Sequence, residues 1–154
     1  MSETKPARVP GRSRTAARHR ARELALQFLY RWLINPEPVS ALCAEARQAE
    51  GFAAADAALF DRLLADAVDH AAALREAFAP LLDRPATALS PVEHAVLLLG
   101  AAELAHHPET PYRVVINEAV ELAKTFGGTD GHRYVNGVLD RLVPRLRPHE
   151  APGG

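Results

Sequence analysis

The stretch from residue 114 to residue 139, VVINEAVELAKTFGGTDGHRYVNGVL, constrains the fold more than any other part of the chain. Apolar residues recur at helical spacing on both sides of two adjacent glycines, Gly127 and Gly128. They are Val115, Ile116, Ala119, Val120, Ala123 and Phe126 before the glycines, and Val135, Val138, Leu139 and Leu142 after them. The pattern therefore predicts a helix, a break at the glycines and a second helix.

The junction between these two helices carries signals for both helix ends. Lys124 falls in the last turn of the first helix, and Gly127 can take the left-handed conformation that ends a helix. Thr129 or Asp130 can then accept hydrogen bonds from the free amides of the next helix. The polar residues gathered at this corner are Asp130, His132, Arg133, Tyr134 and Asn136. This concentration of hydrogen-bonding and stacking groups makes the corner a candidate functional site.

The rest of the chain is also helical in pattern. We predict helices from about residue 13 to the prolines at 36 and 38, over 39–50, over 55–78 and from 90 to about 105. The helix over 55–78 has an apolar stripe, and Arg62 and Asp66 on it are spaced to form a surface ion pair. Ser90 and Glu93 have the spacing of a capping box. The helix that they begin is apolar nearly all round, so we expect it to be the central buried one.

The architecture that follows is all-α, a single domain of about six to seven helices. We find no convincing strand alternation and no internal repeat. Residues 1–13 hold prolines and basic residues among few apolar groups, and we expect a disordered arm there. The folded domain then covers 14–148, with the last helix ending near Pro144 and a flexible tail over 149–154.

Composition favours a cytoplasmic protein. The chain is 48% hydrophobic and 24% charged, as ordinary globular proteins are. Its longest apolar run, 95–102, is far too short to span a bilayer, and its N-terminus lacks the apolar segment of a secretory signal. A single cysteine, Cys43, excludes an internal disulfide and suits a reducing compartment.

Charge is unevenly distributed along the chain. Residues 1–22 hold seven Lys/Arg and one acid, whereas the remainder holds eleven Lys/Arg and eighteen acids. Arg14, Arg18 and Arg22 are spaced to share one helix face, with His19 between them and Arg20 pointing elsewhere. A charge run is usually a solvated face, but no acid occurs between Glu3 and Glu23, and arginines are unfavourable at a helix N-terminus. We therefore favour binding of a polyanion.

The corner after Gly128 has two interpretations. In the structural one, Asp130 is a helix cap, His132 a polar residue of the first turn and Tyr134 an aromatic at the edge of the core. In the functional one, Tyr134 stacks on an unpaired base and Arg133 meets phosphate, as in proteins that recognise single-stranded RNA.

The sequence offers little for catalysis, metals or cofactors. His106 and His107 are adjacent and point to different sides of a helix, and His70 and His94 belong to other predicted helices. The glycine pair lacks the lysine and serine of a phosphate-binding loop and follows a helix. We therefore predict a protein that is not an enzyme and holds no metal or cofactor; an enzyme that uses the histidines with a metal is the competing class.

Three segments give the chain its resemblance to a known family. They are ARHRARELALQFLYRW, SPVEHAVLLLGAAEL and PYRVVINEAVELAKTFGGTDGHRYVNGVLDRL. Over about residues 18–148 the chain resembles the NusB family of bacterial transcription antitermination factors. The resemblance implies two packed helical subdomains and binding of boxA RNA together with NusE, a small-subunit ribosomal protein. It further implies antitermination complexes with NusA, NusG and RNA polymerase, notably in ribosomal RNA operons.

The resemblance also implies site residues. RNA is met by Arg18, His19, Arg20 and Arg22 near the start and by Asp130 and Tyr134 at the start of the last helix. NusE is met by Tyr30 and Glu93, although Glu93 is also the acid of the predicted capping box. With Arg14, His132 and Arg133 from the residues themselves, these form the predicted interface. We expect the glycine break to aim Asp130 and Tyr134 toward Arg18 and Arg22, as two walls of one RNA site.

The chain departs from the family at three of these positions. His19 stands where arginine or lysine is usual, Gly131 where serine is common and Tyr134 where phenylalanine is usual. The first change removes a charge near neutral pH, the second removes a hydroxyl, and the third keeps the stacking face. An alternative within the resemblance is the NusB-like domain that precedes RNA cytosine methyltransferases, here without a catalytic domain.

Overall fold

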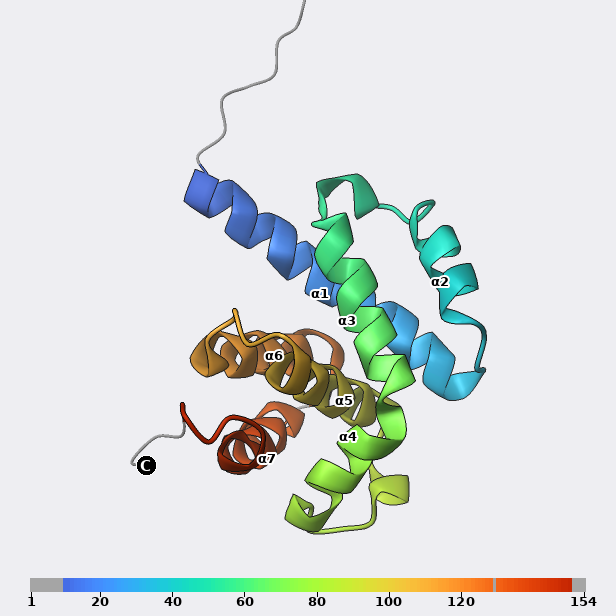
Figure 1. The fold of residues 1–154 in the computed structure, drawn as a ribbon. Helices are drawn as coiled ribbons and strands as arrows, with labels where there is room; N and C mark the ends of the chain where they lie inside the picture. Colours follow the sequence, from blue (N-terminus) through green and yellow to red (C-terminus); the bar gives the residue numbers. More distant parts are fainter. Residues whose placement is uncertain (1–9, 129, 151–154) are drawn as a thin grey trace, which may run out of the picture.

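The computed structural model describes residues 10–128 and 130–150, and within these ranges it is all-helical, as predicted (Figure 1). The α-helices are α1 (Pro10–Ile34), α2 (Val39–Ala46), α3 (Ala57–Asp69), α4 (Ala71–Phe78), α5 (Pro91–His106), α6 (Tyr112–Phe126) and α7 (Gly131–Leu146). Three short 3-10 helices, η1 (Phe52–Ala54), η2 (Ala79–Leu81) and η3 (Ala86–Ala88), lie in the connections. No helix in the described ranges is long and apolar enough to cross a membrane.

The helices pack as two groups that share α5. Helix α5 packs against α1 and α3 in one group and against α4, α6 and α7 in the other, and α2 packs on α1 and α3. Every residue of α5 from Ala95 to Leu104 is buried, which confirms the prediction of a central helix. The capping box is confirmed too: the Ser90 hydroxyl accepts from the Glu93 amide at 3.1 Å, and Glu93 Oε1 accepts from the Ser90 amide at 3.3 Å.

The helix predicted over 55–78 is wrong in one respect, because the chain bends at His70. This residue ends α3 and precedes α4, with φ −111° and ψ 18°. The bend lets one apolar stripe serve two surfaces: α3 packs against α1 and α5, and α4 packs against α5 and α7. All the predicted members of the stripe are buried, namely Phe60, Leu64, Ala67, Ala71, Leu74 and Phe78.

Three other local predictions need correction. The helix predicted over 39–50 ends at Ala46. Helix α1 begins at Pro10, so the last residues assigned to the disordered arm are helical. Arg62 and Asp66 do not pair with each other, because tertiary partners are available: Arg62 bonds Glu109 at 3.0 Å, and Asp66 bonds His107 at 2.8 Å.

The junction between α6 and α7 differs from its prediction. Gly127 is extended rather than left-handed, with φ −100° and ψ −173°. A Cβ there would lie 2.7 Å from the Ala123 carbonyl oxygen, so close approach of the backbone is what requires a glycine. Asp130 occupies the N-cap position of α7, but its side chain makes no capping bond. Thr129, the other predicted cap, lies outside the described residues.

Candidate nucleic-acid interface

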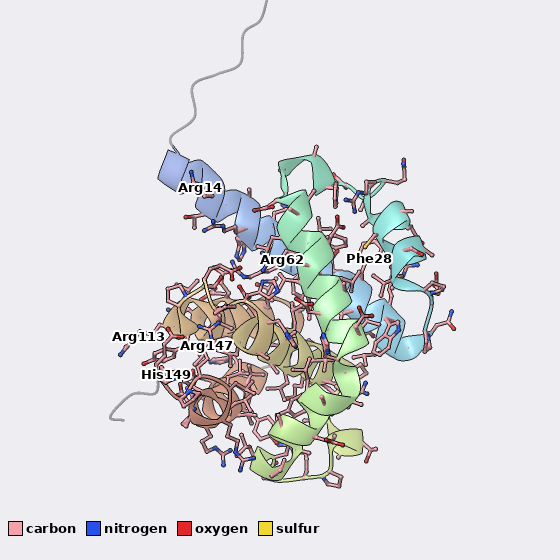
Figure 2. All side chains as sticks on the ribbon, in the orientation of Figure 1. Arg14, Phe28, Arg62, Arg113, Arg147 and His149 are labelled. Carbon is pink, nitrogen blue, oxygen red and sulfur yellow. The ribbon has the colours of Figure 1, made fainter. Side chains whose placement is uncertain are left out.

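The first turns of α1 present basic side chains to solvent. Arg14 and Arg18 are both exposed, and Figure 2 shows Arg14 near the free end of α1, beyond the packed body of the protein. Arg20 is also exposed and pairs with Glu23 at 3.0 Å. His19 lies between two carboxylates, 2.9 Å from Glu118 Oε1 and 3.3 Å from Glu23 Oε2. Glu23 offsets part of the charge of Arg20, so Arg14 and Arg18 dominate this patch.

Arg22 does not share that exposure. It is only 4% exposed, and its Nε and Nη2 atoms donate to the Glu103 carboxylate at 3.0 and 2.6 Å. Burial disfavours the charged guanidinium, but the hydrogen bond and charge of Glu103 outweigh that effect and raise the pKa of Arg22. The predicted three-arginine face is thus reduced to Arg14 and Arg18, because α1 turns Arg22 into the core toward a partner on α5.

The second predicted cluster lies at the start of α7. Asp130 and Arg133 are exposed there, and His132 is half-buried. Tyr134 is half-buried against the core, and its hydroxyl accepts from the Asp83 amide at 3.2 Å. Burial is the main cause of the raised pKa of this phenol.

One face of the Tyr134 ring is already covered. The guanidinium carbon of Arg84 lies 4.4 Å from the ring centroid, and Arg84 is itself exposed and paired with Asp83 at 2.8 Å. A base that stacked on this face would have to displace Arg84 or stack on the guanidinium instead. Arg84 joins the cluster only through folding, and its place in the sequence carries no signal of that.

The two basic clusters do not face each other. Helices α1 and α6 run parallel: His19 contacts Glu118, and further along both helices Tyr30 shares a groove with Phe126. The corner that follows Phe126 therefore lies beside the Tyr30 segment, about 18 Å along the helix axis from Arg18. The expected two-walled RNA site stays a prediction, and in it one RNA strand would have to span both clusters.

The residues predicted to meet a protein partner adjoin an apolar groove of about 320 Å³. Its lining residues are Leu26, Gln27, Tyr30, Arg31, Val92 and Phe126. Tyr30 is 38% exposed and Phe126 36%, unusually high for large apolar side chains. The periodicity of α6 assigned Phe126 to the core, but in the structure Phe126 lines the groove with Tyr30 and Val92.

The Glu93 carboxylate contacts both the start of α5 and the start of α7. One carboxylate oxygen completes the capping box, and the other would lie 3.2 Å from a Cβ at Gly131. Gly131 is buried at this contact, so the glycine brings α7 close to the start of α5. The predicted partner residue Glu93 and the predicted RNA residue Asp130 are thereby near neighbours.

The histidines form no metal site among the described residues. His70 and His106 stack with their ring centroids 4.2 Å apart, and the pKa of His106 is lowered mainly by burial and secondarily by the charge of His70. His107 is fully buried and bonds Asp66.

The NusB family profile matches residues 19–144, which is most of the chain. The chain belongs to the NusB family. Proteins named transcription antitermination protein NusB are close in sequence. That of Burkholderia cenocepacia (strain HI2424) is 56% identical over 135 residues, covering 88% of this chain and 93% of the relative. That of Ralstonia pickettii (strain 12J) is 55% identical over 144 residues, covering 94% and 91%.

Solved NusB structures have the same fold. NusB of T. maritima superposes with a TM-score of 0.73 at 26% identity, covering 86% of this chain and 94% of that one. A chain from a complex of the antitermination factors NusB and NusE with double-stranded RNA superposes with a TM-score of 0.72 at 26% identity, covering 82% and 96%. The all-helical NusB fold expected from the sequence is thus confirmed.

Proposed function

We propose that this NusB-family protein is a transcription antitermination factor that binds boxA-type single-stranded RNA together with NusE. It does so in the cytoplasm, as a non-enzymatic part of complexes with NusA, NusG and RNA polymerase, notably on ribosomal RNA operons. The observation that carries the proposal is the order of features along α1. Exposed arginines lie at one end, the Tyr30 groove lies at the other, and the Asp130 corner is beside that groove.

This order suits a joint RNA and protein partner. A single strand that reaches from Arg14 and Arg18 to Arg133 and Tyr134 has to pass near the groove, and a protein seated on Tyr30 and Phe126 would border it. The similarity in fold to a chain from a NusB–NusE complex with double-stranded RNA supports RNA and NusE as the classes of ligand. Arg22 is left out of the proposed phosphate contacts, because its guanidinium is buried and its Nε and Nη2 atoms bond Glu103.

RNA binding is tested by fluorescence anisotropy with boxA RNA, with and without NusE, across a salt series. Affinity is expected to fall with the logarithm of salt concentration, with a slope of about −0.7 for each phosphate neutralised. The double variant Arg14→Ala/Arg18→Ala should flatten that slope and weaken all RNAs alike. Arg145→Ala, which removes an exposed cation at the far end of α7, is the control and should leave the slope unchanged. An unaltered slope in the double variant would contradict the role of this patch.

The partner contact is tested by capture of NusE on immobilised protein. Tyr30→Ala should weaken capture without lowering the melting temperature, since the side chain is 38% exposed. Phe28→Ala, a core substitution on the same helix, should lower the melting temperature but leave NusE capture by the folded protein nearly unchanged. A loss of stability in Tyr30→Ala equal to that of Phe28→Ala would make Tyr30 a core residue only.

The methyltransferase-associated domain is the second candidate, and it predicts RNA binding that gains nothing from NusE. The titration with and without NusE separates the two.

A further inference from the structure

A second hollow, of about 430 Å³, lies beside the exposed arginines of α1. Its walls come from α1, from the start of α3 and from the loop and first turns of α6. The charged residues that line it are Arg18, Arg22, Asp56, Arg62, Glu109 and Glu118. Figure 2 shows Arg62 on α3, close to where that helix crosses α1. The predicted interface includes none of the three acids.

The charges around this hollow cancel. Three arginines face three carboxylates, so the lining suits neither a phosphate nor a metal cation. Mixed donors and acceptors instead match a neutral, polar group with hydrogen-bonding edges. An unpaired nucleobase is such a group, and proteins that read single-stranded RNA bind splayed bases by their edges and faces. Carboxylates accept from the amino groups of bases, and guanidinium groups donate to their oxygens and ring nitrogens.

Arg22 supplies a donor at the bottom of the hollow. Glu103 engages its Nε and Nη2, whereas among the described residues Nη1 has only the ion pair with Glu118, at 3.8 Å. That distance is beyond a hydrogen bond. A side chain that is 4% exposed thus points an incompletely used N–H group at the hollow, held rigidly by its pair with Glu103.

An apolar wall completes the site. Val114 on the first turn of α6 is 41% exposed and lines the hollow together with Leu59 and Pro111. An exposed branched side chain next to charged groups offers a surface for the face of a flat ring. Arg18, exposed at the rim, is placed to meet the phosphate that follows such a base.

We propose that this hollow receives one unpaired nucleobase of the bound RNA, with Val114 against its face and Arg22 and the carboxylates at its edges. The inference rests on the proposed function and adds a base-specific contact to the phosphate contacts of Arg14 and Arg18. It makes part of RNA recognition dependent on the α1–α3–α6 junction, more than two helical turns away from the Asp130 corner.

The test is an abasic scan. BoxA RNAs that each lack one base are titrated against the intact protein with NusE, and one position next to the α1 contact should lose about 5- to 140-fold in affinity. Val114→Trp and Ala58→Trp fill the hollow from two exposed positions, and circular dichroism checks their folding. Both variants should bind intact boxA RNA only as tightly as the parent binds that abasic RNA. Removing the same base from the RNA should then cause no further loss of affinity in either variant. Ala72→Trp, exposed on α4, is the matched control and should bind as the parent protein does.

The outcomes are distinct. If both filled variants bind intact boxA RNA normally and keep the parent's abasic profile, the hollow holds no base and the inference is overturned, while the proposed function stands. If the parent protein does not bind boxA RNA even with NusE, the proposed function fails and the inference falls with it.

Discussion

Arg22 and Glu103 form a bidentate ion pair between α1 and α5, with N–O distances of 3.0 and 2.6 Å. The two residues are 4% and 2% exposed, so the pair lies inside the protein. It joins α1 to the central helix α5, which both packed groups share. Loss of one partner leaves the other charge buried without compensation, which costs far more than loss of an exposed ion pair.

Arg22→Ala should lower the free energy of unfolding by about 3–5 kcal/mol, because the Glu103 carboxylate would be left buried and unpaired. Arg18→Ala, four residues earlier but exposed, should change it by less than about 0.5 kcal/mol. Urea unfolding followed by circular dichroism measures both. Equal stability of the two variants would show that the Arg22–Glu103 pair is not energetically important. Arg22→Met combined with Glu103→Leu should recover most of the loss, since an apolar pair needs no charge compensation.

Substitution of Arg147 should also lower the free energy of unfolding strongly. Its side chain is 7% exposed and donates to the carbonyl oxygens of Leu104 at 2.8 Å, Glu103 at 3.1 Å and His107 at 2.7 Å, at the C-terminal end of α5. Arg147→Lys cannot reach all three, and each buried carbonyl left unpaired costs about 1–3 kcal/mol. Arg145→Lys, at an exposed position of α7, is the control and should leave the free energy of unfolding nearly unchanged. Equal stability of Arg147→Lys and Arg145→Lys in chemical denaturation would contradict a structural role for the Arg147 hydrogen bonds.

Two glycines in helices should respond in opposite directions to alanine. A Cβ at Gly137 would meet nothing within 4 Å, so Gly137→Ala should raise the free energy of unfolding by about 0.5–1 kcal/mol through helix propensity. A Cβ at Gly100 would lie 3.0 Å from Leu139 Cδ1, where α5 and α7 are in close contact. Gly100→Ala should therefore cost about 1–3 kcal/mol. Thermal melts of the two proteins that shift in the same direction would be inconsistent with this packing.

Stability should fall in mild acid. Burial, and secondarily the charge of Arg75, lower the pKa of His94, whose ring accepts from Arg75 Nε at 2.9 Å. An unfolded histidine takes up a proton near pH 6.5, so below about pH 7 the unfolded chain binds more protons than the folded one and the free energy of unfolding drops.

His94→Gln keeps an acceptor for Arg75 but has no proton to gain. The difference in unfolding free energy between about pH 8 and about pH 5.5 should therefore be smaller in this variant than in the parent. His106, whose pKa is also lowered, should retain its own share of the pH dependence. An identical pH profile in His94→Gln and parent would remove His94 from this explanation.

Tyr134 separates stacking from structure. Tyr134→Ala should weaken the binding of boxA RNA by about 1–3 kcal/mol, as loss of a base stack does. Tyr134→Phe keeps the ring and should bind the RNA nearly as tightly as the parent protein does. Arg84→Ala uncovers one ring face and tests whether the guanidinium or the ring meets the base. Anisotropy titrations give all three affinities; unchanged binding in Tyr134→Ala would end the stacking role.

Much of the fold could be read from local pattern. The stripe from Phe60 to Phe78, the Ser90–Glu93 capping box and the all-round apolar α5 depend on neighbours within one or two turns, and those neighbours are visible in the sequence. The same spacing did not show the bend at His70. A stripe continues through a bend when both halves face the same core, so periodicity cannot distinguish one long helix from two short ones.

The sequence by itself determined that α1 carries arginines at i, i+4 and i+8, that a polar corner follows α6 and that the chain is helical throughout its core. Only the tertiary structure decided which arginine is available. Arg22 turns inward because it pairs with Glu103, 81 residues later on α5, while Arg18 is exposed and has no such partner within residues 10–128 and 130–150. It also decided that the corner lies beside Tyr30 and apart from Arg18, since α6 runs parallel to α1. Helical spacing is a local property, whereas burial of a charge and the placement of a corner depend on which distant helix is packed alongside.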